Sequence, residues 1–368
     1  MSAEQLISFA RGAPSLDIVD VEGLKAAAVR AFDADPAGVT AYGTSTGYPP
    51  LRRWIAEKHG VPVDQVLVTN GSLQADAFLF DHLVSAGDAV VVERPTYDRT
   101  LLNLQNKGAK VHQVTIEPDG IDTDELRQLL ESGVRPTLAH IIPNYQNPAG
   151  VTLSESKRHT LLELAAEYGF VIFEDDPYVD IRFRGEPLPS MLSIANGGGA
   201  RAGTVVHASS FTKTVCPGVR VGYLVGPAPL LADIARKATN LYISPGMVAQ
   251  AIVHQFCVSG DIDRSIETVR TALAERATVL AASLREHIPG ARFTEPDGGY
   301  FLWVELPADI RVDALVAAAA ERGVAVVKGS DFLLDGGDHA LRLAYSAVTV
   351  DRIDEGVRRL AAAIETIR

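Results

Sequence analysis

The sequence predicts an α/β protein with a large domain, built on a mostly parallel seven-stranded sheet covered by helices, and a smaller α+β domain. Two observations predict this class. Between residues 66 and 225, short apolar runs alternate with amphipathic stretches of helical period. After about Ser244 the alternation ends, and the longest helical pattern of the chain runs from Asp261 to about Ile288. Strands that alternate with helices are joined by crossovers, which favour a parallel sheet buried on both faces.

The large domain accounts for most of the predicted elements. Helical patterns at Val21–Phe32 and Leu51–Lys58 precede the first strand. The predicted strands are the apolar runs Val66–Thr69, Ala89–Val92, Lys110–Val114, Thr137–Ile142, Phe170–Phe173, Val205–Ala208 and Val221–Val225. The predicted helices between them are Ser72–Leu83, Tyr97–Leu104, Thr123–Leu130 and Glu155–Tyr168. Gly169 provides a glycine stop for the last of these helices.

The segment after Asp261 predicts the smaller domain. Its expected elements are a hairpin-like pair at Arg292–Thr294 and Gly299–Leu306, a helix at Val312–Arg322, strands at Val324–Val327 and Leu341–Ala344, and a final helix. The final helix has Ile353, Val357, Leu360 and Ile364 on one face. We therefore expect three segments: residues 1–40, which pack with the small domain, residues 41–246, which form the large domain, and residues 247–368, which form the small domain.

Composition and charge narrow the function classes. The 368 residues include 34 Lys and Arg against 46 Asp and Glu, and this net charge of −12 argues against nucleic acid or an anionic membrane as partner. No apolar run approaches the ~20 residues of a membrane span, and the N-terminus lacks the pattern of a signal peptide. Cys216 and Cys257 are too few for a disulfide scaffold. The expectation is a cytoplasmic protein that binds neither nucleic acid nor membrane.

The segment from Ser209 to Arg220 has the most informative pattern. It follows a predicted strand, and open α/β sheets bind ligands at the carboxyl ends of their strands. Lys213 could form a Schiff base with an aldehyde cofactor, while the hydroxyls of Ser210 and Thr212 and the Arg220 guanidinium hold a phosphate. On these residues alone, a solvated loop lysine beside helix-capping hydroxyls is an equally good interpretation.

Three further segments favour the cofactor interpretation. Asp175 ends an apolar strand, where its carboxylate could pair with a protonated pyridine nitrogen while Tyr178 donates to a phenolic oxygen of the same ring. Asn147, which follows the preceding strand, offers an amide to that oxygen. Gly71 and Ser72 open a helix, and helix N-termini bind phosphate. Each segment also has a plainer interpretation: a metal-binding or helix-capping carboxylate, a turn, and a serine cap.

Together these segments resemble the class I and II aminotransferases, which are fold-type I pyridoxal-phosphate enzymes. The order of a glycine-serine turn, an aromatic residue, Asn-Pro-x-Gly, Asp-x-x-Tyr, Ser-x-x-Lys, arginine and a late Leu-Arg-Leu spans essentially the whole chain. The opening Ile7–Pro14 is similar to that of the aminoadipate, kynurenine and aromatic aminotransferase subgroup. Ala149 and Leu73 depart from the resemblance, because threonine and glutamine are usual at these positions.

The resemblance implies a role in cofactor binding for each matching residue. Lys213 would be the Schiff-base lysine and the proton carrier, and Asp175 would pair with the pyridine nitrogen. Asn147 and Tyr178 would contact the phenolic oxygen, and Tyr97 would stack on the ring. The phosphate would be bound by Gly71, Ser72, Ser210, Thr212 and Arg220.

The resemblance also implies how substrate and a partner subunit would bind. Arg342, in Leu-Arg-Leu, would hold the substrate α-carboxylate, with Asn147 beside it and Gly12 as a backbone contact. Tyr42 would reach the phosphate of the neighbouring subunit, which implies a homodimer with shared active sites.

The implied function is an aminotransferase that moves an amino group between an L-amino acid and a 2-keto acid by a ping-pong mechanism. Arg11 stands where a small residue is common. It either faces the pocket and binds an acidic side chain, with glutamate and 2-oxoglutarate as one substrate pair, or pairs with a surface carboxylate. Arg99 is a second candidate for the same role.

Other functions fit parts of the pattern. A β-lyase, cyclase or decarboxylase could use the same fold and cofactor, because the sequence does not show which Cα bond lies perpendicular to the ring. A non-catalytic module that senses the cofactor or an amino acid is less favoured, because the chain has no basic stretch and no room for a winged helix. A metal hydrolase using Asp175 and Asp176 is least favoured, and no metal is expected, because the nine histidines show no metal-ligand spacing.

Overall fold

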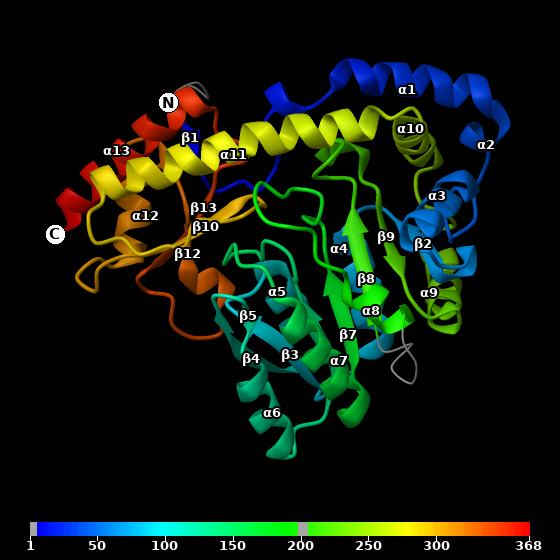
Figure 1. Ribbon diagram of the computed structural model, residues 1–368, viewed down its shortest axis with the longest axis horizontal. Coiled ribbons are helices and arrows are strands. Elements are labelled where there is room, and N and C mark those ends of the chain that lie inside the picture. The colour runs from blue at the N-terminus through cyan, green and yellow to red at the C-terminus, as the bar shows by residue number, and fades with distance from the viewer. Residues whose placement is uncertain (1–5, 198–204) are drawn as a thin grey trace.

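The computed structural model describes residues 6–197 and 205–368. Their largest feature is an eight-stranded sheet (Figure 1). Its eight strands lie in the order β2-β9-β8-β7-β6-β3-β4-β5. They are β2 (Val66–Thr69), β3 (Ala89–Arg94), β4 (Lys110–Glu117), β5 (Gly120–Ile121), β6 (Pro136–Ile141), β7 (Val171–Asp175), β8 (Val205–Ser210) and β9 (Gly222–Val225). The five neighbouring strands β8, β7, β6, β3 and β4 run parallel to one another. In contrast, β9 is antiparallel to both of its neighbours. The predicted class is confirmed, with one strand more: β5 is too short to give an apolar run.

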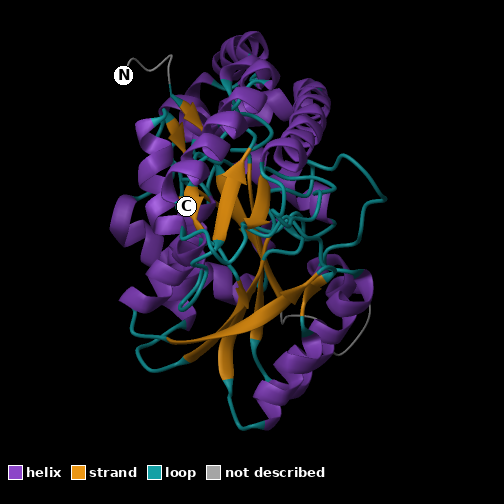
Figure 2. Cartoon of the chain, turned by 90° about the vertical axis from the view of Figure 1, so that its left-hand side faces the viewer, coloured by secondary structure: helices purple, strands orange, loops and turns teal. Residues whose placement is uncertain are grey.

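Helices cover both faces of the large sheet (Figure 2). One face packs against α4 (Ser72–Leu83), α5 (Asp98–Asn106) and α9 (Ala228–Tyr242). The other packs against α1 (Val21–Ala34), α3 (Pro49–His59), α6 (Thr123–Glu131), α7 (Glu155–Tyr168), α8 (Met191–Gly197) and α10 (Met247–Val258). Alternation along each strand supplies both cores: in β7, Ile172 faces the α7 side and Phe173 faces the α4 side.

A second core surrounds a smaller sheet. Strands β10 (Phe301–Glu305), β13 (Ala340–Ala344) and β12 (Val327–Lys328) form an antiparallel sheet beside α12 (Val312–Glu321) and α13 (Val350–Ile367). The N-terminal β1 (Ile7–Ser8) pairs in parallel with β11 (Val324–Ala325). The chain then crosses to the large sheet, where α1 packs against α10 and the short α2 (Pro36–Thr40) follows. The boundaries at residues 40 and 246 stay predictions.

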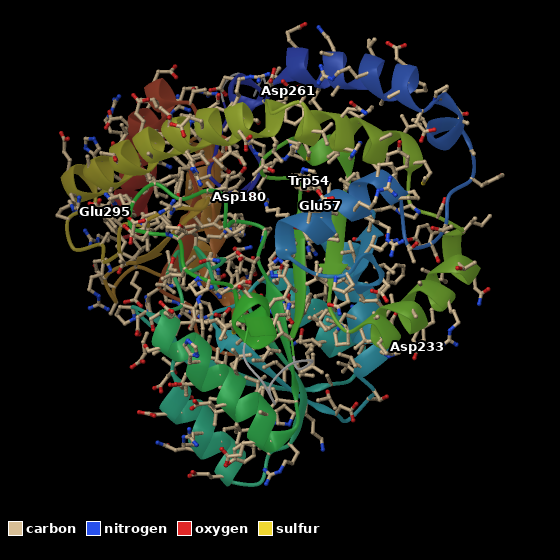
Figure 3. The ribbon with its side chains drawn as sticks, turned by 45° about the vertical axis from the view of Figure 1, so that its right-hand side comes forward. Trp54, Glu57, Asp180, Asp233, Asp261 and Glu295 are labelled. Carbon is tan, nitrogen blue, oxygen red and sulfur yellow. The ribbon has the colours of Figure 1, made fainter. Side chains whose placement is uncertain are left out.

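The long α11 (Asp261–His287) connects the two cores (Figure 1). Its first residue, labelled in Figure 3, accepts a hydrogen bond from Arg30 of α1, with 2.5 Å between Nη2 and Oδ2. Ile262 still packs in the large core, whereas Val269 and Leu273 belong to the small one. Of the helices in the described residues, none is long and apolar enough to cross a membrane.

Candidate active site

A cavity of about 310 Å³ lies at the carboxyl ends of the parallel strands, where the two cores meet. It gathers most of the predicted site residues: Gly12, Ser72, Tyr97, Asn147, Asp175, Tyr178, Ser210, Thr212, Lys213, Arg220 and Arg342. These residues come from strand ends, helix starts and the N-terminal segment, so only the folded chain brings them together.

Lys213 lies in the loop after β8 and points into the cavity. Its Nζ donates a hydrogen bond to the carbonyl oxygen of Gly12 at 2.8 Å. The same atom lies 4.9 Å from the ring centre of Tyr300 and 5.3 Å from that of Tyr178. Burial, together with the positive charge of Arg342, lowers the pKa of Lys213 to about 7. A large fraction of the amine is therefore neutral near pH 7, and the neutral amine is the form that attacks a carbonyl carbon.

The predicted phosphate-binding residues meet at the N-terminus of α4. An ideal Cβ on Gly71 would lie 2.2 Å from Nη2 of Arg220, so glycine leaves room for the guanidinium. Arg220 has a left-handed backbone (φ 49°, ψ 46°), which is strained for this residue type, and its Nη2 donates to the Asn70 carbonyl oxygen at 3.4 Å. Ser210 Oγ donates to Thr212 Oγ1 at 2.8 Å. Helix amides, hydroxyls and a guanidinium together form a site for an anion.

Asp175 presents a buried carboxyl group with one unused oxygen. Its Oδ2 lies 3.4 Å from Nε2 of His140, which is on the neighbouring β6. Its Oδ1 accepts no hydrogen bond from the described residues, although the side chain is only 7% exposed. A buried oxygen of this kind normally has a donor, so the cavity is arranged to receive one.

Arg342, on β13, reaches the cavity from the small sheet. Its Nη1 donates to Asn147 Oδ1 at 3.2 Å, and its Nη2 donates to the Ala10 carbonyl oxygen at 2.7 Å. The guanidinium carbon lies 4.5 Å from the ring centre of Phe301 and 4.8 Å from that of Phe332. Its buried Nε has no partner among the described residues. An oriented guanidinium with an unused N–H is suited to bind a carboxylate in two places.

Two tyrosines and a glycine complete the cavity wall. Burial raises the pKa of Tyr97 to about 12 and holds that of Tyr178 well above its usual range, so both phenols keep their protons. Gly12 is in close contact with the small sheet, because an ideal Cβ there would lie 2.5 Å from Cζ of Phe301. This contact brings the N-terminal segment to the cavity.

Four of the predicted residues do not line the cavity. Gly71 acts behind it, as the support of Arg220. Tyr42 is 88% exposed, and Arg11 is exposed as well. Arg99, the second candidate for an acidic side chain, is also exposed and is absent from the cavity wall.

The cavity wall also contains residues that the sequence did not single out: Asp76, Asp98, Ile142, Pro177 and Phe301. The sequence does offer a signal for Asp76, because this acid lies on the apolar side of a helix, one turn after Ser72. Phe301 had none, because its contact with Gly12 joins distant parts of the chain. In the described ranges 6–197 and 205–368, no group of three or more His, Cys, Asp or Glu residues is placed to hold a metal ion.

An amine at a strand end, an anion site at a helix start and a buried carboxylate, all on this α/β fold, are the features expected of a fold-type I pyridoxal-phosphate enzyme. Residues 4–360 match the family described as "Aminotransferase class I and II". The chain therefore belongs to the class I and II aminotransferases, whose cofactor is pyridoxal phosphate.

The similarity extends over nearly the full length of several relatives. A 2-aminoadipate transaminase from Thermus thermophilus is 32% identical over 98% of this chain and 90% of its own. The crystal structure of an α-aminoadipate aminotransferase from the same species, in complex with N-(5'-phosphopyridoxyl)-L-leucine, superposes with a TM-score of 0.94 at 32% identity, over 99% of this chain and 93% of that one. The kynurenine aminotransferase of Pyrococcus horikoshii gives a TM-score of 0.92 at 30% identity, over 99% and 92%.

Proposed function

We propose that this aminotransferase moves the amino group of an L-amino acid to a 2-keto acid by a ping-pong mechanism, with its cofactor bound at Lys213. The observation that carries the proposal is the Lys213 amine. It is half-buried in the cavity wall with a pKa of about 7, and the charges of Arg342 and Asp175 both act on it. It is therefore able to attack an aldehyde and later to accept and return a proton at Nζ.

The cavity has the donors and acceptors that pyridoxal phosphate needs. The unused Oδ1 of Asp175 would accept the pyridine N–H, and Asn147 and Tyr178 would donate to the phenolic oxygen. Tyr97 would cover a ring face. The phosphate would be held by Ser72, Ser210, Thr212 and Arg220, with the space that Gly71 leaves open.

The protein's own residues then divide the work of the reaction. When bound, the cofactor supplies an aldehyde and an electron-withdrawing ring that acidifies the Cα–H of the amino acid. Lys213 would take that proton at Nζ and deliver it to the cofactor carbon that is bonded to the transferred nitrogen. Arg342 would hold the substrate α-carboxylate with its guanidinium, and this orients the Cα–H toward Lys213. Asp175 contributes a negative charge that keeps the pyridine nitrogen protonated.

We further propose glutamate and 2-oxoglutarate as one substrate pair. The similarity to a 2-aminoadipate transaminase supports an acidic substrate. Arg11 does not support it within one chain, because its side chain is exposed and outside the cavity wall. If Arg11 binds the acidic side chain, R11A raises the KM for glutamate at least tenfold and leaves that for a neutral amino acid unchanged. Equal KM values for glutamate in R11A and wild type would remove Arg11 from this role.

A homodimer with shared active sites is the assembly that we propose. Tyr42, Leu241 and Ile243 are apolar or aromatic side chains with 88%, 69% and 51% of their surface exposed. We expect these side chains to lie in the interface between two subunits. In a dimer, Tyr42 would reach the phosphate site of the partner subunit.

The visible absorption spectrum tests the proposal. Added pyridoxal phosphate is expected to give the band of a lysine-bound cofactor, and one amino acid among a panel should convert it to the pyridoxamine form with release of a keto acid. K213A should lose at least about 10³-fold in turnover, because general base and covalent attachment are both removed. K237A, an exposed lysine elsewhere, is the control. A cofactor band that no amino acid converts would instead favour a lyase, cyclase, decarboxylase or sensor.

A further inference from the structure

A buried glutamine lies directly before the cofactor residue Asn147 in the sequence. Gln146 is fully buried, in the loop that follows β6. Within this loop its Oε1 accepts a hydrogen bond from the Ala149 N–H at 2.8 Å. Its backbone N–H donates to the Val151 carbonyl oxygen at 2.9 Å, and its carbonyl oxygen accepts from the Gly150 N–H at 2.6 Å. The backbone and the side chain of Gln146 therefore both hold the turn on which Asn147 lies.

The same side chain also reaches the loop that follows β3. Nε2 of Gln146 donates to the Pro95 carbonyl oxygen at 2.9 Å and to Oε2 of Glu93 at 3.0 Å. Pro95 lies two residues before Tyr97, which is in the cavity wall. Both N–H groups and the oxygen of the Gln146 amide thus have protein partners. This amide joins the turn that carries Asn147 to the turn that carries Tyr97.

The acid that anchors Gln146 is buried between neighbouring strands. Glu93 is in β3 and is 1% exposed, and its Oε2 also accepts from the N–H of Ile142, which follows β6. Burial raises the pKa of Glu93 to about 8, so most of it carries a proton near pH 7. An oxygen that accepts twice is arranged as the carbonyl oxygen of such a neutral acid would be. Gln146 is therefore fixed to the sheet itself.

The Asn147 side chain has its oxygen occupied. Nη1 of Arg342 donates to Asn147 Oδ1 at 3.2 Å, so Nδ2 is the group left to donate into the cavity. Under the proposed function, Nδ2 donates to the phenolic oxygen of the cofactor. Asn147 is in the loop between β6 and α7, where side-chain hydrogen bonds such as those of Gln146 take the place of a strand ladder. The reach of this amide thus depends on what fixes its turn.

We propose that Gln146 is a positioning residue, which holds the Asn147 amide at hydrogen-bond distance from the phenolic oxygen of the cofactor. Glu93 and Pro95 are its anchors on the neighbouring turn. Gln146 itself lies behind the cavity wall rather than in it. The inference rests on the proposed function, because Gln146 acts through Asn147 on a bound cofactor.

The test follows the pH at which the visible absorption band of the lysine-bound cofactor titrates. This titration belongs to the nitrogen that joins the cofactor to Lys213, and the phenolic oxygen attracts the proton on that nitrogen. A hydrogen bond from Asn147 to the oxygen weakens this attraction and lowers the pKa of the nitrogen. Loss of the bond should therefore raise the pKa, with a fall of about tenfold in the acid ionisation constant.

Variants of three residues make up the experiment. N147A removes the amide and should show the full effect. Q146L keeps the volume of Gln146 without its hydrogen bonds, and it should lower the ionisation constant at least about fivefold. Adding Q146L to N147A should change nothing more, because Gln146 acts through Asn147. The matched control is Q250L: Gln250 is 1% exposed and joins the Tyr48 N–H to the Gly246 carbonyl oxygen outside the cavity wall, so its loss should lower stability alone.

A second pair of variants decides the matter should Q146L fail to fold. E93L removes the anchor and should lower the ionisation constant at least about threefold. The loss of an acid by itself would act in the opposite direction, so charge cannot imitate this result. E93Q keeps an acceptor for Gln146 and should titrate like the wild type.

The outcomes separate this inference from the proposed function. Wild-type titration in Q146L and E93L, beside a shifted N147A, would overturn the role of Gln146. So would a Q146L effect that persists in the N147A background. If N147A titrates like the wild type, the contact of Asn147 with the cofactor is contradicted instead. A wild type that gives no visible band with pyridoxal phosphate would contradict the cofactor site itself.

Discussion

At the scale of single residues, the cavity is defined by charges that the fold holds close together. Lys213 is neutral for a large fraction of the time because burial and Arg342 both oppose its protonation. The Arg342 guanidinium lies beside the rings of Phe301 and Phe332, and two of its nitrogens donate hydrogen bonds to Asn147 and Ala10. Side chains that are oriented before the substrate arrives lose little entropy on binding it.

Replacement of Arg342 should therefore affect substrate binding more than cofactor binding. R342K keeps the charge but not the planar fork, and R342Q loses both, so we expect KM for the amino donor to rise about 10-fold and 100-fold respectively. Steady-state kinetics and a cofactor titration of each variant separate the two effects. Equal KM values in R342Q and wild type would exclude Arg342 as the carboxylate ligand.

At the scale of elements, the chain's turns are as specific as its side chains. Gly71 ends the connection from β2 to α4 with φ +85°, and the absence of a Cβ admits Arg220. Gly60, which ends α3 with φ +63°, has nothing within 4 Å of an ideal Cβ. Both positions have a positive φ, but Gly60 is left-handed helical (ψ 36°), whereas Gly71 (ψ 162°) is in a region that essentially only glycine adopts, and their surroundings differ as well.

The pair tests the phosphate site through cofactor affinity rather than through stability. G60A should lose about 1 kcal/mol of stability, which is the cost of a left-handed alanine, and bind cofactor normally. G71A should add displacement of the Arg220 guanidinium and weaken cofactor binding at least tenfold. Thermal unfolding and a cofactor titration measure the two quantities. Normal cofactor affinity in G71A would mean that Arg220 does not depend on Gly71.

A buried pair between β7 and β8 predicts a pH dependence of stability. His207 Nδ1 lies 2.9 Å from Glu174 Oε2 on the face opposite Asp175, and these residues are register partners. Burial lowers the pKa of His207, but the hydrogen bond and charge of Glu174 have the larger effect, so the pKa of His207 is raised overall. Burial raises the pKa of Glu174, but the interaction with His207 has the larger effect, so the pKa of Glu174 is lowered overall.

The sign of each shift sets the pH window of this pair. The His207 contribution is complete below its unfolded pKa near 6.5 and is lost as pH rises through the raised value. The Glu174 contribution is complete above about 4.5 and is lost as pH falls through the lowered value. E174Q should lower the free energy of unfolding by about 3 kcal/mol. Most of this loss should appear at pH values between the lowered pKa of Glu174 and the raised pKa of His207. E305Q, in the exposed Arg292–Glu305 pair, should cost under about 1 kcal/mol. A wild-type-minus-E174Q difference that is flat with pH would contradict the pairing.

At the scale of the whole molecule, one long helix and the N-terminal segment hold the two cores together. Arg276 of α11 is buried and donates to the Ser346 carbonyl oxygen, to Ser15 and to Asp17, so it ties the N-terminal segment to the small core. The proposed dimer would add the surface around Tyr42 and Leu241 to this framework.

A charge in that surface should separate the subunits. L241D is expected to convert the dimer to a monomer and to lower activity, because each site would lose the partner's Tyr42. L334D, at a leucine that is 43% exposed in the C-terminal part of the chain, should do neither. Analytical ultracentrifugation beside an activity assay records both. A monomeric wild type, or a dimer that is unchanged in L241D, would refute the proposed interface.

Local pattern alone predicted much of this protein. Helices α4 and α7 begin and end where apolar periodicity and the Gly169 stop placed them, because these signals act within a few residues. Lys213, Asp175 and Asn147 each lie within five residues of the end of a predicted strand. Parallel strands bring their carboxyl ends to one edge, so the meeting of these three residues in one cavity could be predicted. Helices α9 and α10 were missed, the latter because an almost wholly apolar helix has little periodicity.

Only the tertiary structure decided which side chains share the cavity. The meeting of Arg342 with Asn147 and Ala10 joins three distant segments, and the exposure of Arg11 depends on how its segment crosses the small sheet. Asp76 lines the cavity because α4 covers the Asp175 side of the sheet, which the local pattern does not show. The physical reason is range: hydrogen bonding and periodicity specify elements locally, whereas charge coupling and burial depend on packing between residues far apart in the chain.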